Sequence, residues 1–140
     1  MSQQILIVDD EAAYRHMVRS LLTIDGYQIR EARDGVEGLA SVRQEHPDIV
    51  LLDIMMPRMD GFAVCRALRA VPALADLPVI IISALTSEEV RVRALNAGAN
   101  VTMNKPLVYP QLLSHVRALL PLPASTGRTA APVAGPRFSW

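Results

Sequence analysis

The feature that most constrains this chain is a set of short, uninterrupted aliphatic runs. Residues 5–8, 49–52 and 79–82 contain only isoleucine, leucine and valine. A strand with no polar alternation is buried on both faces, which is typical of a parallel sheet covered by helices. Two further segments, 27–32 and 100–104, are weaker strand candidates.

Segments with helical periodicity separate these strands. Apolar residues recur at helical spacing in segments 14–22, 36–42, 62–68, 90–95 and 112–120. Residues that favour helix ends flank them: Gly26 as a C-terminal cap, Asp34 and Asp60 as N-terminal caps, Thr86 to Glu89 as a capping box, and Pro110 in a first turn. Five strands alternating with five helices predict an α/β fold, a three-layer αβα sandwich with a parallel sheet.

Composition excludes several classes of protein. Fourteen basic residues balance fourteen acidic ones, which argues against a general nucleic-acid binder. The single cysteine, Cys65, excludes an internal disulfide, fits a reducing compartment, and is expected to be a core residue. No apolar run has the length of a membrane span, and the first residues do not resemble a signal peptide. We therefore expect a soluble, cytoplasmic protein.

The charged residues divide the chain into two parts. All the acidic residues and twelve of the basic ones lie in residues 1–120, which we predict to be one domain. Residues 121–140 contain four prolines, four alanines, two arginines and no acid. Such a segment has too little apolar content for a core, so we expect a flexible tail or linker.

Polar residues stand at the ends of four of the predicted strands. Asp9 and Asp10 follow the first strand, Asp53 the third, Ser83 the fourth and Lys105 the fifth. The carboxyl ends of parallel strands lie at one edge of the sheet, where open α/β folds bind their ligands. We therefore expect these five side chains to form one site.

The residue types at this edge point to phosphoryl chemistry. Three neighbouring carboxylates repel one another unless a cation joins them, and Mg²⁺ prefers carboxylate oxygens together with water and phosphoryl groups. Lys105, the only lysine of the chain, adds a compact positive charge, and Ser83 adds a hydroxyl donor. An aspartate can itself be the covalent acceptor of a phosphoryl group.

Four motifs in this order resemble the receiver domain of two-component response regulators, and the resemblance covers residues 4–120. They are Val8-Asp9-Asp10-Glu11, the segment 51–61 that contains Asp53-Ile54-Met55-Met56-Pro57, Ile81-Ile82-Ser83-Ala84, and Gly98-Ala99 leading to Lys105-Pro106. The resemblance implies a flavodoxin-like (βα)5 fold with sheet order 2-1-3-4-5. It also favours a cis Lys105–Pro106 bond.

The resemblance also implies a role for each site residue. Asp53 would accept a phosphoryl group from a phosphohistidine on a sensor histidine kinase or phosphotransfer protein. Mg²⁺ would be bound by Asp10, Asp53 and the backbone carbonyl of Met55, with Asp9 acting through water. Lys105 and Ser83 would contact the phosphoryl oxygens. The expected partners are that kinase or phosphotransfer protein and a downstream effector domain or protein, with no nucleic acid bound by this segment and no membrane.

One position departs from the family pattern. Many receivers carry tyrosine or phenylalanine three residues before the lysine, and here that residue is Thr102. A threonine side chain cannot fill the space of an aromatic ring. We expect phosphorylation to change the surface of the fourth and fifth helices little. Glu11 has two open interpretations, as the start of the first helix or as a neighbour of the metal's water.

Two other functions fit the sequence less well. An aspartate-nucleophile phosphatase usually has a second acid two residues after its nucleophile, but Met55 follows Asp53 at that spacing, and Glu11 follows Asp9. The short loops of this chain also leave no room for the cap domain of such a phosphatase. A nucleotide-binding domain would need a glycine-rich loop after the first strand, where this chain has consecutive acids.

Overall fold

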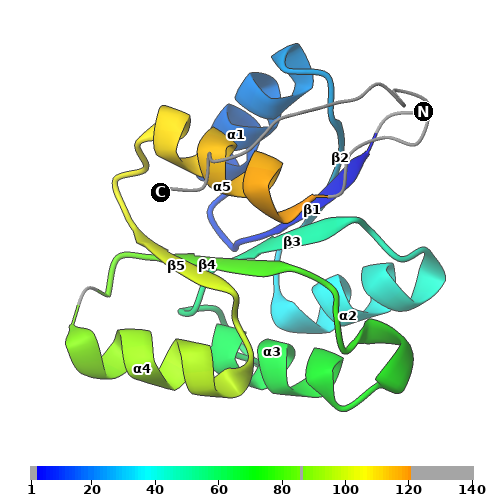
Figure 1. The fold of residues 1–140 in the computed structure, drawn as a ribbon, viewed down its shortest axis with the longest axis vertical. Helices are drawn as coiled ribbons and strands as arrows, with labels where there is room; N and C mark the ends of the chain where they lie inside the picture. The colour runs from blue at the N-terminus through cyan, green and yellow to red at the C-terminus, as the bar shows by residue number, and fades with distance from the viewer. Residues whose placement is uncertain (1–2, 86, 121–140) are drawn as a thin grey trace.

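The computed structural model describes residues 3–85 and 87–120. A five-stranded parallel sheet with the order β2-β1-β3-β4-β5 forms its centre (Figure 1). The strands are β1 (Gln4–Val8), β2 (Gln28–Ala32), β3 (Ile49–Leu52), β4 (Val79–Ser83) and β5 (Val101–Asn104). The predicted flavodoxin-like sandwich, its strand order included, is confirmed.

Helices cover both faces of this sheet (Figure 1). They are α1 (Ala12–Ile24), α2 (Gly35–Gln44), α3 (Gly61–Arg69), α4 (Glu88–Ala97) and α5 (Tyr109–Leu119), with a short 3-10 turn, η1, at Pro72–Leu74. Buried residues of α1 and α5 share one apolar cluster, and those of α2, α3 and α4 share the other. None of the helices in the described part of the chain has the length and apolar character needed to cross a bilayer.

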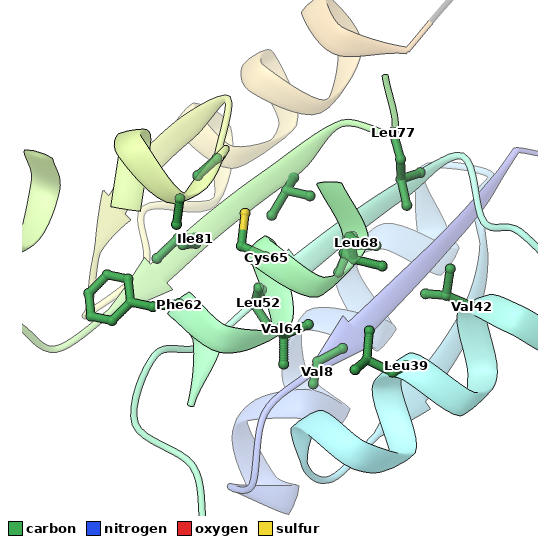
Figure 2. Packing of buried hydrophobic residues seen from close by; sticks show 14 of the residues in the cluster. Val8, Leu39, Val42, Leu52, Phe62, Val64, Cys65, Leu68, Leu77 and Ile81 are labelled. Atoms are coloured by element: carbon green, nitrogen blue, oxygen red, sulfur yellow. The ribbon is translucent and has the colours of Figure 1, made fainter. Parts of the chain in front are cut away.

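The aliphatic strands supply alternate residues to these two clusters. Ile5 and Ile7 of β1 pack toward α1 and α5, whereas Leu6 and Val8 pack toward α2 and α3. Figure 2 shows the second cluster, where Cys65 lies among aliphatic side chains with no exposed surface. The prediction that Cys65 is a core residue is confirmed.

Helix ends agree with the sequence predictions at some positions and not at others. Asp34 and Asp60 cap α2 and α3, accepting hydrogen bonds from the backbone N–H groups of Glu37 and Ala63. The cap of α4 is Ser87, which accepts from Val90. The cap therefore lies one residue later than predicted, and it is not part of a capping box because Val90 stands three residues after Ser87. Thr86 itself lies outside the described residues.

Some apolar residues of the periodic segments do not face the core. The side chains of Met17 in α1 and Val36 in α2 are 45% and 50% exposed. Residues at the edge of an apolar helical face satisfy the same spacing as buried ones, so periodicity alone does not separate them. The predicted flexible tail, residues 121–140, lies outside the described residues.

Candidate functional site

The sheet brings the three aspartates together at the carboxyl ends of β1 and β3. Carboxylate oxygens of Asp9, Asp10 and Asp53 all lie within 4.8 Å of one another. The Asp9 N–H donates to the carbonyl of Ala32 at 3.1 Å, and the Asp53 N–H donates to that of Val8 at 2.9 Å. Because these bonds continue the ladders of the sheet, both residues are fixed where their strands end.

The loop that carries Asp53 is closed tightly by Gly61. The Gly61 N–H donates to the Ile54 carbonyl at 2.8 Å. A Cβ atom at this position would lie 2.9 Å from the Cα of Ile54 and closer still to the Asp53 carbonyl oxygen. Only a glycine therefore lets the start of α3 approach the loop after β3 this closely.

The Lys105 ammonium reaches across from β5 into the carboxylates. Its Nζ lies 2.8 Å from Asp9 Oδ2, 3.5 Å from Glu11 Oε1 and 3.9 Å from Asp53 Oδ1. The Lys105 N–H donates to the Ser83 carbonyl at 2.9 Å, which ties the end of β5 to the end of β4. The Lys105–Pro106 bond is cis, as predicted.

This crowding alters the protonation of two groups. Burial, together with the negative charge of Asp9, raises the pKa of Asp53 to about 6, although Lys105 opposes that rise. Burial disfavours the charged form of Lys105, but the hydrogen bond to Asp9 and the nearby carboxylates outweigh it and raise its pKa. The site therefore has an excess of negative charge that one ammonium only partly balances.

Ser83 lies between the carboxylates and a hollow beneath α4. Its side chain is buried, and its hydroxyl accepts a hydrogen bond from the N–H of Leu85 at 3.1 Å. It also lines a cavity of about 120 Å³ between β4, β5 and α4. Thr102 lines the same cavity.

A family model describing the response regulator receiver domain matches residues 5–117. The chain belongs to this family. The sequence resemblance is thereby confirmed for almost the whole of the described part of the receiver.

Named relatives and solved structures agree with this assignment. Over 120 residues the receiver is 44% identical to the response regulator MprA of Mycobacterium tuberculosis, covering 86% of this chain and 51% of that protein. It thus spans about half the length of the curated relatives it matches.

The solved structures show the same fold. A receiver domain of a signal transduction histidine kinase from Syntrophus aciditrophicus is 34% identical, with a TM-score of 0.80 and coverage of 95% of this chain and 98% of that one. The Vibrio cholerae chemotaxis protein CheY4 is 30% identical, with a TM-score of 0.81 and coverage of 86% and 100%.

The acidic pocket of this receiver has the donors that a magnesium ion requires. Hard divalent cations take oxygen ligands, and Mg²⁺ keeps several waters besides one or two carboxylates. Asp9 and Asp53 are buried whereas Asp10 is exposed, so the three carboxylates span the boundary between protein and solvent. The residues present therefore fit the ion.

Glu11 and Met55 lie at the exposed side of this pocket. Glu11 precedes α1 without capping it by its side chain, and its carboxylate lies near Lys105 instead. Its interpretation as the start of the first helix is confirmed, because Glu11 is the N-cap residue of α1 and its carbonyl accepts a hydrogen bond from the N–H of Arg15. Met55 lies in the loop two residues after Asp53, with its side chain 59% exposed.

Two residues that the sequence analysis did not select also contact the site. Arg15 donates to the backbone carbonyl of Asp9 at 2.7 Å and is paired with Glu31. The ring of Tyr14 lies beneath the Lys105 ammonium. Both come from the first turns of α1, where sequence spacing identified Tyr14 only as one member of an apolar face.

Proposed function

We propose that this receiver accepts a phosphoryl group on Asp53 from a phosphohistidine of a sensor histidine kinase or phosphotransfer protein. The observation that carries the proposal is the surroundings of the Asp53 carboxylate. Carboxylate oxygens of Asp9 and Asp10 lie within 4.8 Å of it, and the Lys105 ammonium lies 3.9 Å away. A buried nucleophile between a cation-binding acid pair and an ammonium suits transfer of a phosphoryl group.

In this proposal Asp10, Asp53 and the backbone carbonyl of Met55 hold Mg²⁺, and Asp9 acts through water. The bound ion supplies positive charge against the carboxylates and the phosphoryl oxygens. Asp53 attacks phosphorus with one carboxylate oxygen as the phosphorus–nitrogen bond breaks, and the bonding electrons return to the histidine nitrogen. Lys105 and the Ser83 hydroxyl then donate to the phosphoryl oxygens.

Water later hydrolyses the acylphosphate and restores the Asp53 carboxylate. The chain therefore acts as a signalling acceptor with one phosphoryl group per molecule, and turnover of external substrates is not part of the proposal. The phosphatase alternative is not favoured, because the position two residues after Asp53 is an exposed methionine.

The output of the phosphorylated receiver is proposed to lie with a downstream effector domain or protein. The curated relatives are about twice as long as the matched region, so part of their length lies outside the receiver. We expect the exchange with the kinase to take place in the cytoplasm, and no nucleic acid or membrane is proposed as a partner of residues 1–120.

The proposal is tested by intact-mass measurement after incubation with acetyl phosphate and Mg²⁺. Wild-type protein is expected to gain one phosphoryl mass, and Asp53→Asn none. Asp60→Asn, which changes a helix-capping aspartate in the same loop region, serves as the matched control and should still be modified. A phosphoryl mass on the Asp53→Asn variant would assign the reaction to another residue.

A further inference from the structure

The Lys105 ammonium is enclosed on two sides by different kinds of group. Carboxylates of Asp9, Glu11 and Asp53 lie within 3.9 Å of Nζ. The face of the Tyr14 ring lies beneath it, with Nζ 4.2 Å from the ring centroid. An ammonium at this distance from an aromatic face is attracted by the negative charge density of the ring.

We propose that Tyr14 is a positioning residue whose ring holds the Lys105 ammonium in place for an incoming phosphoryl group. The proposal rests on the function proposed above for Asp53 and deepens it. Lysine has a long, flexible side chain, so a site that fixes its ammonium in advance lowers the ordering cost of binding an anion.

The ring can hold the ammonium when the Asp53 carboxylate cannot. When Asp53 carries a phosphoryl group, Lys105 exchanges its contact with the Asp53 carboxylate for one with a phosphoryl oxygen, and its other N–H groups remain for Asp9 and further acceptors. The Tyr14 face is uncharged, accepts no conventional hydrogen bond in this geometry, and does not bind a metal ion. It therefore remains a partner for the ammonium both before and after that exchange.

The hydroxyl group of Tyr14 has no comparable role. Its oxygen is buried and has no hydrogen-bond partner among the described residues. The side chain also lines a cavity of about 10 Å³ together with Asp9, Asp53 and apolar residues of the sheet. Burying an unpaired hydroxyl opposes folding, so the ring rather than the hydroxyl carries the proposed role.

The experiment compares Tyr14→Phe, which keeps the ring, with Tyr14→Leu, which removes it. Because Lys105 is the only lysine of the chain, its side-chain protons give a unique NMR signal. Protons above a ring face are shifted upfield, so the signal measures the contact directly. Tyr27→Leu is the matched control, since Tyr27 packs against the same apolar cluster as Tyr14.

In Tyr14→Leu we expect the upfield shift of Lys105 to disappear. The affinity for beryllofluoride, a phosphoryl mimic, measured by titration with Mg²⁺ present, should fall about three- to tenfold. Tyr14→Phe and Tyr27→Leu should keep both properties, and thermal melts should show each variant to be folded. Tyr14→Met gives a second ring-free variant if Tyr14→Leu does not fold.

Two results would overturn the proposal. One is an unchanged affinity in a folded ring-free variant that has lost the Lys105 shift. The other is an equal loss in Tyr14→Phe, which would assign the effect to the hydroxyl. If wild-type protein binds no beryllofluoride, the function proposed for Asp53 fails instead, whereas the NMR shift still tests the contact between Tyr14 and Lys105.

Discussion

The two sides of Ser83 are held in different ways. On the side of β1 and β3, Asp9 and Asp53 are fixed by main-chain hydrogen bonds and joined through Lys105. On the side of α4, the side chain borders a cavity of about 120 Å³ that Thr102 and Leu85 also line. One edge of one sheet thus combines a crowded charged region with a loosely filled one that polar and apolar side chains line together.

We infer from this difference that the charged side carries out the phosphoryl chemistry and that the side near α4 responds to it by moving side chains. Charged groups that must meet a phosphoryl group need fixed positions, because small displacements weaken electrostatic stabilisation. The space beneath α4 allows side chains to move without breaking a hydrogen-bond ladder. Substitutions on the two sides should therefore have different effects on stability and on the response to a phosphoryl mimic.

Removing a cation should have the largest effect on the charged side. In metal-free buffer near pH 7.5, Lys105→Met should lower the free energy of unfolding by about 3–5 kcal/mol, since it leaves buried carboxylates without their ammonium. Urea unfolding measures this. The loss should shrink below about pH 6, where Asp53 binds a proton.

Arg91→Met is the matched control on the α4 side. Arg91 pairs with Glu88, and both side chains are largely exposed. Exposed pairs contribute little, so no measurable change in unfolding is expected. An equally small effect of Lys105→Met would show that solvent already screens the carboxylates, and the comparison would fail.

Removing the Asp53 charge should change the free energy of unfolding in the opposite direction and stabilise the fold. The pKa of Asp53 is raised from 3.8 to about 6, so between these values the native state binds more protons than the unfolded chain, and stability falls as pH rises. Without metal at pH 7.5, Asp53→Asn should therefore raise the free energy of unfolding by up to about 3 kcal/mol. The gain should vanish near pH 3.5.

The control for this titration is Asp76→Asn, at an exposed position before β4. At pH 7.5 it should change the free energy of unfolding by no more than about 0.5 kcal/mol, as is usual at exposed positions. A stability gain for Asp53→Asn that persists unchanged at pH 3.5 would mean that the unfavourable charge of Asp53, which is buried and lies near Asp9, is not its cause.

Larger side chains should also affect stability differently on the two sides, by smaller amounts than the charge changes. A methyl group at Gly61 meets backbone atoms of Asp53 and Ile54, which have no room to yield, so Gly61→Ala should destabilise the fold by about 2 kcal/mol. Thr102→Leu adds carbon atoms beside the α4 cavity and should stabilise by about 1 kcal/mol. Urea unfolding of both variants tests this, and destabilisation by Thr102→Leu would contradict a loosely filled cavity.

The sequence predicted the parts of this molecule whose signal is local. Aliphatic runs coincide with β1, β3 and β4 because strands buried on both faces must be apolar at every position. The position of the site followed from the same reasoning, since polar residues directly after such runs lie at the carboxyl edge of a parallel sheet. The strand order came from family resemblance, because crossover connections leave no mark on composition.

Features that depend on packing were not predictable in this way. Thr86 and Ser87 are adjacent hydroxyl residues, and the sequence alone does not show which of them caps α4. In the structure the cap is Ser87. The ring of Tyr14 lies beneath Lys105 because of how α1 is rotated against the sheet, which periodicity fixes only approximately. The α4 cavity likewise depends on side chains from separate elements that the sequence does not show together.

The smallest expected effect concerns the surface of α4 and α5. A side chain that took the place of the missing aromatic ring would have to move toward Thr102. Leu107 packs against the apolar cluster beneath α1 and α5 and would have to leave it, whereas Met103 belongs to that cluster and already lines the cavity. Leu85 is 38% exposed at the rim of the cavity, and its N–H already bonds to Ser83. A change at Ser83 should therefore turn Leu85 inward and extend little further.

Amide shifts of the apo and beryllofluoride-bound forms test this difference. We expect large changes around Asp53 and from Ser83 to Leu85, and small ones along α4 and α5. In Thr102→Leu, which fills the cavity, the change at Leu85 should shrink while those around Asp53 remain, because the charged side does not depend on that space. Changes along α4 and α5 as large as those at Asp53 would mean that the loosely filled side switches as a whole without an aromatic ring at position 102.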